Sequence, residues 1–167
     1  VESVKTANKL DIDVIITDHH MTGDTVPPAF AIINPKQKEC AYPEKMLCGS
    51  GVAFKLIQAL IQKGNFSLPV GWEKWLLDMV AIATLSDMVP LVGENRVFAT
   101  YGLKVLRKSP RLGLVMLLKK AKTDQRYLTE DDIGFTIGPR INAASRMGVP
   151  KDAFKLLAAT DLDEAVL

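Results

Sequence analysis

The sequence has 167 residues, of which 48% are hydrophobic and 24% are charged, and its formal net charge is +2. This composition is typical of a globular domain and excludes a disordered chain, a collagen-like chain and a disulfide-stapled scaffold. No apolar run is long enough to span a bilayer and the N-terminus has no signal-peptide pattern, so we predict a cytoplasmic protein with no membrane partner. Cys40 and Cys48 are spaced too widely for a zinc ribbon, and we interpret them as reduced thiols.

The first half of the chain alternates helix and strand patterns. Residues 1–10 have helical spacing, and β-branched runs at 12–17 and 29–34 predict two buried parallel strands. Two strands alone do not make a stable sheet, so we expect further strands upstream of Val1 and treat the chain as part of a longer protein. A loop is predicted over 34–49, with helices over 51–62 and 72–85, the second of them buried because it is apolar all round.

The second half shows helix patterns and no convincing strand pattern. Thr129, followed by three acidic residues, predicts a helix start, and Gly138-Pro139 predicts an interruption of the chain. Asp161 is expected to cap a last helix that runs to Leu167. The other predicted helices span 95–107, 112–122, 141–146 and 150–157.

Positive charge is concentrated in residues 93–126, which hold nine Lys and Arg against two Asp and Glu. A solvated helical face is one interpretation of this segment, which we call the basic block. A wall that attracts the phosphate backbone of DNA is the other. The block consists of Arg96, Lys104, Arg107, Lys108, Arg111, Lys119, Lys120, Lys122 and Arg126.

The tripeptide Asp18-His19-His20 directly follows the first strand pattern. Ligands of open α/β sheets bind at the carboxyl ends of the strands, and carboxylate with imidazole suits Mn²⁺ or a similar divalent ion. Neighbouring side chains of an extended segment point in opposite directions, so we expect one imidazole to bind a metal and the other to face substrate or Asp18. The alternative is an Asp that caps a helix, followed by two surface histidines.

Three further segments hold candidate site residues. Asp87 ends an apolar helix, where negative charge is unfavourable, so a metal ion or another positive group is expected beside it. Ser50 lies between two glycines at a helix start, where free N–H groups bind anions. In the third segment, residues 138–148, small side chains allow a ligand to approach the backbone closely, and arginines bind phosphate. Its candidates are Arg140, Asn142 and Arg146.

Each segment also has an alternative interpretation without function. Asp87 could be a solvated residue at a helix end, and the glycines around Ser50 could only start a helix. Residues 138–148 could be a packed helix junction with surface arginines.

Taken in order, five stretches resemble the DHH phosphoesterase superfamily and, within it, the RecJ family of single-stranded-DNA-specific exonucleases. The stretches are VIITDHH (14–20), PPAFAIINPKQKECAYP (27–43), CGSGVAFKL (48–56), ATLSDMVPLVGENR (83–96) and IGPRINAASRMG (137–148). The resemblance covers nearly the whole chain and implies an α/β fold. Residues 1–92 would be the C-terminal part of a parallel-sheet DHH catalytic domain, and residues 93–167 a mostly helical connector that carries the GPRINAA motif.

The resemblance implies a metal-dependent exonuclease that degrades single-stranded DNA in the 5′ to 3′ direction in recombination and repair. A pair of Mn²⁺ or Mg²⁺ ions would activate the attacking water. Single-stranded DNA would be the substrate, and a helicase or a single-strand-binding protein would be repair partners. Two alternatives stay open: another DHH phosphodiesterase, acting on short oligonucleotides or nucleotide phosphates, and a non-catalytic DHH-like scaffold that binds DNA.

The resemblance also implies roles for individual residues. His19 and Asp87 would be metal ligands, Asp18 would ligate or orient the metal site, and His20 would lie beside the scissile phosphate. The implied phosphate contacts are Arg140, Asn142, Arg146 and Ser50.

The chain departs from the family pattern at two places. The aspartate-rich metal motifs that precede the DHH tripeptide in the family are absent, so we expect an incomplete metal site and no activity of the isolated chain. Ser145 stands where the family usually has Gly, and we expect this small side chain to be tolerated.

Overall fold

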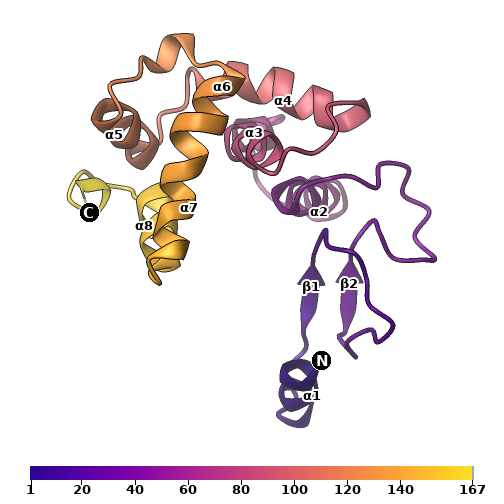
Figure 1. Cartoon of the computed structure of the whole chain (residues 1–167). Helices are drawn as coiled ribbons and strands as arrows, with labels where there is room; N and C mark the ends of the chain where they lie inside the picture. Colours follow the sequence, from indigo (N-terminus) through magenta and orange to yellow (C-terminus); the bar gives the residue numbers. More distant parts are fainter. Residues whose placement is uncertain (167) are drawn as a thin grey trace.

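A computed structural model describes residues 1–166, which form a two-stranded parallel sheet and a larger helical part (Figure 1). No helix among these residues is long and apolar enough to cross a membrane. The elements are, in order, α1 (Glu2–Lys9), β1 (Ile15–Thr17), β2 (Ala31–Ile33), α2 (Gly49–Lys63), η1 (Trp72–Leu76), α3 (Leu77–Ser86), α4 (Gly93–Leu106), α5 (Leu112–Lys120), η2 (Gln125–Tyr127), α6 (Glu130–Asp132), η3 (Ile133–Ile137), α7 (Gly138–Arg146), α8 (Pro150–Ala158) and η4 (Glu164–Val166).

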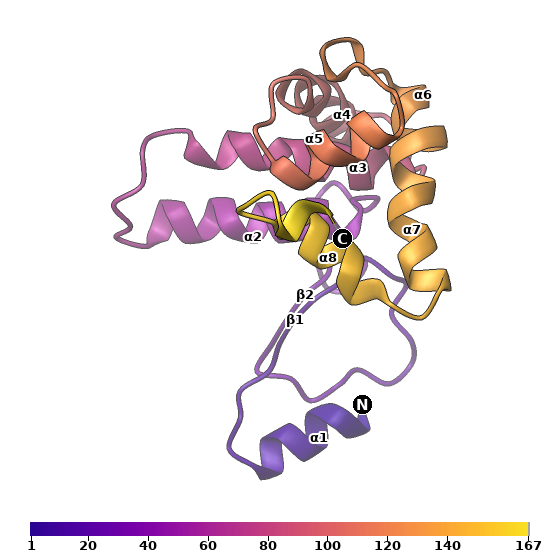
Figure 2. The ribbon, with the colours of Figure 1, turned by 90° about the vertical axis from the view of Figure 1, so that its left-hand side faces the viewer.

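The predicted parallel pair is present. β1 and β2 are hydrogen-bonded in parallel, with Ile16 opposite Ile32, and both strands point toward α2 (Figure 1). The strands are shorter and less buried than predicted: Ile15 is 59% exposed, and α1, which has no buried residue, lies on the far side of the strands from α2 (Figure 2). The carboxyl ends of both strands therefore lie at the same edge of the sheet, next to the start of α2.

Helix α3 lies at the centre of the molecule and contributes to two hydrophobic cores. Val80 packs with Leu47, Val52, Phe54 and Phe98, from the loop before α2, α2 itself and α4. Ile82 packs with the core formed by Leu106, Leu114, Leu118, Leu128, Ile133 and Ile137. An apolar helix over 72–85 was predicted to be buried, and α3 is buried on several sides. The prediction is wrong for the start of that range, because Trp72 and Trp75 lie in the separate 3₁₀ helix η1 and are 42% and 53% exposed.

Two arginines of the basic block, Arg107 and Arg111, make hydrogen bonds inside the fold. The buried carboxylate of Asp78 in α3 accepts hydrogen bonds from Ser109 Oγ and Arg111 Nε, both at 2.7 Å, and so ties the α4–α5 connection to α3. Arg107 donates through Nε and Nη2 to the carbonyl oxygen of Leu128. Arg107 and Arg111 therefore have structural roles. The lysines of the block are exposed, as the interpretation of a solvated helical face expects.

The chain continues helical through the predicted interruption at Gly138-Pro139. Thr129 begins the segment with a capping box, in which its hydroxyl accepts from the Asp132 N–H. α6 leads into η3, which is π-helical, and α7 follows without a break. The predicted interruption is wrong: Pro139 lies where π-helical η3 changes to α7, and the altered hydrogen-bond spacing of the π-helical turn lets the chain stay helical there.

The chain end agrees with the predicted cap. Asp161 Oδ1 accepts the N–H of Glu164 at 2.8 Å, at the start of η4. The predicted end of that helix at Leu167 lies outside the described residues.

Candidate functional site

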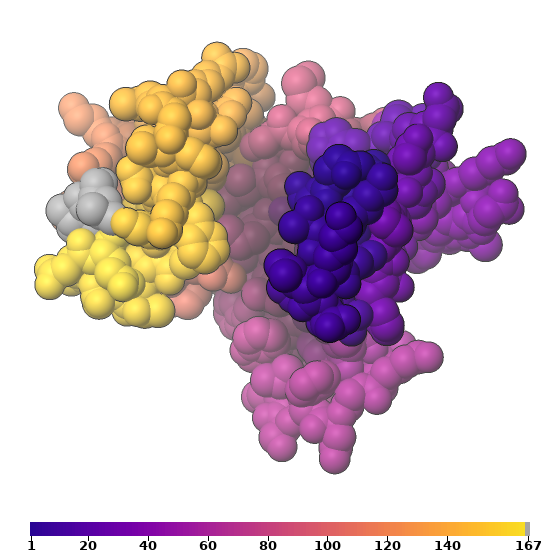
Figure 3. Space-filling view, turned by 90° about the horizontal axis from the view of Figure 1, so that it is seen from below, coloured from indigo at the N-terminus to yellow at the C-terminus, as the bar shows by residue number. Residues whose placement is uncertain are grey.

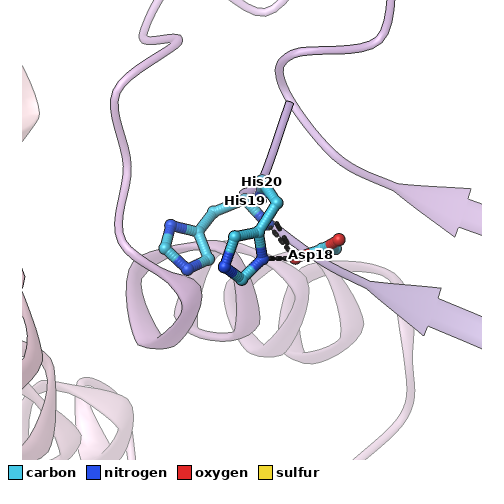
Figure 4. A group of neighbouring side chains, drawn as sticks. All are labelled: Asp18, His19 and His20. Carbon is cyan, nitrogen blue, oxygen red and sulfur yellow. Dashed lines mark hydrogen bonds and ion pairs between the residues drawn. The ribbon is translucent and has the colours of Figure 1, made fainter. Parts of the chain in front are cut away.

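Asp18 organises the turn that follows β1. One of its carboxylate oxygens, Oδ1, accepts the backbone N–H groups of His19 (2.7 Å) and His20 (3.2 Å) and lies 2.7 Å from His20 Nδ1 (Figure 4). An ionised carboxylate only accepts hydrogen bonds, so Nδ1 of His20 is the donor in this contact. The turn thus holds the exposed His20 ring by its Nδ1 edge and leaves Nε2 on the opposite edge.

The same contacts keep Asp18 ionised. The hydrogen bond from His20 lowers the pKa of Asp18 to about 2; burial opposes this shift, and the backbone N–H groups of His20 and His19 reinforce it. The two rings lie side by side, with centroids 4.4 Å apart. The prediction that they point in opposite directions is therefore wrong, because the chain bends around the Asp18 carboxylate and is not extended.

Asn34 supports this turn from the neighbouring strand. It is buried, follows β2 directly, and donates from Nδ2 to the carbonyl oxygen of His20 at 2.9 Å. Its Oδ1 accepts the N–H of Lys36 at 2.9 Å. Asn34 was not among the predicted site residues, although it is the polar residue at the end of the second predicted strand, and a polar residue at a strand end is what drew attention to Asp18.

His19 and Asp87 come together across the space between the sheet and α3. His19 Nδ1 lies 3.4 Å from Asp87 Oδ2, and the two side chains are 21% and 44% exposed. The ring of His19 lies against the start of α2, where a Cβ on Gly49 would be 3.3 Å from its Cδ2. Asp87 is the C-cap of α3, where negative charge is unfavourable, and the imidazole of His19 lies beside its carboxylate.

These donors fit a divalent cation such as Mn²⁺ or Mg²⁺. Imidazole nitrogen and carboxylate oxygen are common ligands of such ions. Two ligands held about 2.1 Å from one octahedral ion lie about 3 Å apart, close to the spacing of His19 Nδ1 and Asp87 Oδ2. Donor atoms of Asp18, His19 and His20 also lie within 4.8 Å of one another.

A cleft of about 910 Å³ opens beside this pair. It lies between the ends of α2 and α3 on one side and α7 and α8 on the other, and the space-filling surface is hollowed between the C-terminal helices and the N-terminal segments (Figure 3). Five predicted site residues line it: His19, Ser50, Asp87, Asn142 and Arg146.

Three predicted site residues do not line this cleft. Asp18 and His20 lie at the turn beside it. Arg140 is exposed and donates from Nη1 to the carbonyl oxygen of Thr136 at 2.8 Å. Helical geometry explains the difference, because Asn142 and Arg146 are one turn apart on the same face of α7, whereas Arg140 projects from another face.

The basic block contributes no lining residue to the cleft. None of its nine Lys and Arg side chains is among the lining groups, and Arg146 is the lining residue with a positive charge in the part of the chain that the structure describes. The placement therefore gives no support to the block as a wall of this particular cleft.

Ser86 is a lining residue that the sequence analysis did not single out. It is exposed, immediately precedes Asp87, and faces the start of α7. A Cβ on Gly138 would lie 2.7 Å from Ser86 Oγ, so glycine at this position lets α7 approach the end of α3. The sequence signal for Ser86 was its position next to Asp87, within the stretch 83–96 that resembles the DHH superfamily.

A protein-family comparison matches the part of the chain that contains the DHH tripeptide. The family model described as "DHH family, N-terminal domain" matches residues 1–84, which include the cleft residues His19 and Ser50. The chain belongs to the DHH family.

Individual relatives of this DHH-family chain are exonucleases by name. It is 46% identical over 165 residues to the single-stranded-DNA-specific exonuclease RecJ of Bacillus subtilis (strain 168), a match that covers 99% of this chain and 20% of the relative. The chain thus spans a fifth of the length of that curated relative. The resemblance to the RecJ family is confirmed.

Solved structures agree with the fold. The crystal structure of RecJ from Thermus thermophilus in complex with Mn²⁺ matches with a TM-score of 0.78 and 34% identity, over 96% of this DHH-family chain and 24% of the other. A second structure, of exonuclease RecJ bound to manganese, matches with a TM-score of 0.77 and 33% identity, over 98% of this chain and 40% of the other. The predicted α/β class, a small parallel sheet followed by helices, is confirmed.

Proposed function

We propose that this chain forms part of the active site of a metal-dependent exonuclease that hydrolyses single-stranded DNA in the 5′ to 3′ direction, in DNA recombination and repair. The observation that carries the proposal is the spacing of 3.4 Å between His19 Nδ1 and Asp87 Oδ2 at the rim of a cleft that also holds Asn142 and Arg146. Side chains that can bind a metal ion and side chains that can donate hydrogen bonds to phosphate thus line the same cleft. The names of the RecJ relatives add the substrate class.

In this proposal each side chain has a task that follows from its position. His19 and Asp87 hold the divalent ion, Mn²⁺ or Mg²⁺, which supplies an activated water and neutralises charge on the phosphate. Asp18 fixes the His20 ring through Nδ1, so that the Nε2 edge is turned toward the scissile phosphate. The turn at the end of β1 therefore combines a metal ligand with a positioned imidazole.

The cleft wall opposite would hold the DNA strand. Arg146 offers a planar cation and Asn142 an amide from the same face of α7, and both suit phosphate oxygens. Ser50, in the first turn of α2, adds a hydroxyl near free backbone N–H groups. Arg140 keeps a role only at a more distant phosphate, because its guanidinium is bound to the carbonyl of Thr136.

The proposal extends to the isolated chain and to its partners. We propose that residues 1–167 alone have no meaningful nuclease activity, because the family resemblance assigns further metal ligands to motifs that this sequence lacks. A helicase, which supplies single strands, and a single-strand-binding protein are the repair partners that such a reaction would use. Metal-dependent cleavage by the purified 167-residue chain would contradict the first statement.

The test is an exonuclease assay on the full-length protein. Single-stranded DNA labelled at the 5′ end should release labelled mononucleotide when Mn²⁺ is present, and a blunt duplex of the same sequence should release much less. Release that is equal on the duplex, or that persists in EDTA, would contradict the proposal. Dinucleotides cleaved in preference to long strands would favour the short-oligonucleotide alternative.

A further inference from the structure

Asn95 is fully buried in the first turn of α4, between the turn that carries Asp87 and the segment before α2, whose first residue lies against His19. Its Nδ2 donates to the carbonyl oxygen of Met46 at 2.8 Å and to that of Pro90 at 3.1 Å. Its Oδ1 is buried without a hydrogen-bond partner. A buried oxygen without a partner disfavours folding, so the benefit of this amide lies in the two bonds that its nitrogen donates.

The bond to Pro90 holds the turn that begins at Asp87. Pro90 lies three residues beyond Asp87, and the intervening Met88 has φ of 53°, in the left-handed region that side-chain-bearing residues rarely adopt. α4 secures this turn at a second point, since Arg96 Nε donates to the carbonyl oxygen of Leu91 at 3.1 Å. The conformation of the Asp87 turn therefore depends on contacts from the start of α4.

The bond to Met46 holds the segment that supports His19. Met46 is followed by Leu47 and Cys48, both buried, and then by the first residue of α2, Gly49, against which the His19 ring lies. Cys48 caps α2, because its Sγ accepts the N–H of Gly51 at 3.4 Å. A shift of the Met46 carbonyl would move the start of α2 and, with it, the surface that positions His19.

We propose that Asn95 is a positioning residue for the metal site, which fixes the separation of His19 and Asp87 by joining the segments that carry or support them. Two backbone carbonyls, those of Met46 and Pro90, converge on the Asn95 Nδ2 here, and both can only accept. One amide nitrogen with two hydrogens satisfies both and keeps the segments at a fixed distance. The inference rests on the proposed function, because it assigns a purpose to the spacing of the two candidate ligands.

The test measures Mn²⁺ binding to the full-length protein by titration calorimetry, with Mn²⁺ alone as the probe. Asn95→Leu removes both donors at similar size, and Asn95→Ala removes them while leaving room for water. Each should raise the Kd for Mn²⁺ by about tenfold or more, the effect typical of losing an orienting contact behind a metal ligand. Cleavage by these variants should recover at high Mn²⁺, so that the half-saturating metal concentration changes far more than kcat does.

Gln125 provides a matched control. Its Nε2 also donates to two backbone carbonyls, those of Leu106 (2.9 Å) and Ser109 (2.8 Å), and it does not line the cleft. Gln125→Leu should lower the Tm in the same way as Asn95→Leu and leave the Kd for Mn²⁺ within about twofold. A purely structural role of Asn95 would make the two variants behave alike.

Three outcomes would overturn the inference. An Asn95→Ala protein that is folded and binds Mn²⁺ as the unsubstituted protein does would remove the positioning role and leave the proposed function intact. An equal loss of Mn²⁺ affinity in Gln125→Leu would show that general destabilisation is the cause. Failure of the unsubstituted protein to bind Mn²⁺ would overturn the proposed function and this inference together.

Discussion

Asn142 and Arg146 lie one helical turn apart on the face of α7 that lines the cleft, opposite the pair formed by His19 and Asp87. The placement sets a cation and an amide across from the candidate metal ligands, at the two sides of one hollow. Arg140 belongs to the same helix and the same sequence motif, and it lies on another face. The two arginines can therefore be distinguished by experiment.

Arg146→Ala should raise the KM for single-stranded DNA by about tenfold, because one charge-assisted hydrogen bond to phosphate contributes about 1.5–3 kcal/mol. Steady-state kinetics on strands of fixed length measure this change. Arg140→Ala is the control on the same helix and should change the KM much less. The assignment of Arg146 would fail if both variants lost affinity equally.

Loss of a proposed ligand should abolish metal binding at the cleft. His19→Ala and Asp87→Asn should each weaken Mn²⁺ binding by more than about a hundredfold, beyond the effect of losing an indirect contact. Calorimetric titration gives the affinity, and circular dichroism confirms the fold. Asp131→Asn, which removes an exposed carboxylate of α6 outside the cleft, should leave the Mn²⁺ affinity unchanged.

Gly113 of α5 lies directly against the backbone of α8. A Cβ on Gly113 would lie 1.6 Å from the carbonyl oxygen of Leu156, and a backbone atom cannot move aside as a flexible side chain can. Gly113→Ala should therefore lower the free energy of unfolding by at least about 2–3 kcal/mol, although alanine favours helix. Gly134→Ala is the comparison, because nothing lies within 4 Å of the added Cβ. Thermal denaturation should show a lower Tm for the first variant and an unchanged or higher Tm for the second.

A half-buried cluster joins the loop before α2 to α2 and α4. Glu94 accepts hydrogen bonds from the Tyr42 hydroxyl and from Lys55 Nζ. Burial favours the neutral acid, but these two bonds outweigh it, so the pKa of Glu94 lies below its ordinary value of 4.5. Burial, together with the bond to Glu94, raises the pKa of Tyr42 above 10.0.

The signs of these shifts define a pH window. A lowered pKa of Glu94 contributes stability that is present above pH 4.5 and is lost as the pH falls through the lowered value. A raised pKa of Tyr42 contributes stability that is present below pH 10.0 and is lost as the pH rises through the raised value. Urea unfolding across this range should show both losses in the unsubstituted protein. Glu94→Gln should remove the acid-side loss and reduce the alkaline-side loss, of which burial of Tyr42 is the larger cause. A curve of unchanged shape would show that the cluster does not contribute.

Local patterns in the sequence predicted most of the elements and the residue types of the site. β-branched runs predicted the two parallel strands, helical spacing predicted α2, α4, α5 and α8, and Thr129 predicted a helix start. Gly138-Pro139 was misleading, because the chain stays helical through it at the junction of the π-helical η3 with α7, and local sequence does not reveal a π-helical turn. The exposure of Trp72 and Trp75 was equally hidden, because periodicity does not show where a 3₁₀ turn gives way to an α-helix.

The sequence by itself determined which chemical groups are present: an acid and two imidazoles after a strand, an acid at a helix end, and arginines among small residues. The local pattern of a few neighbouring residues is enough to show which group follows which strand or helix. Only the tertiary structure decided which of them meet. It brings His19 to Asp87, turns Arg146 but not Arg140 into the cleft, and places Asn34 and Asn95 behind the candidate ligands. Those relations depend on how α3 packs between α2, α4 and α7, and packing across distant segments leaves no periodic trace in the sequence.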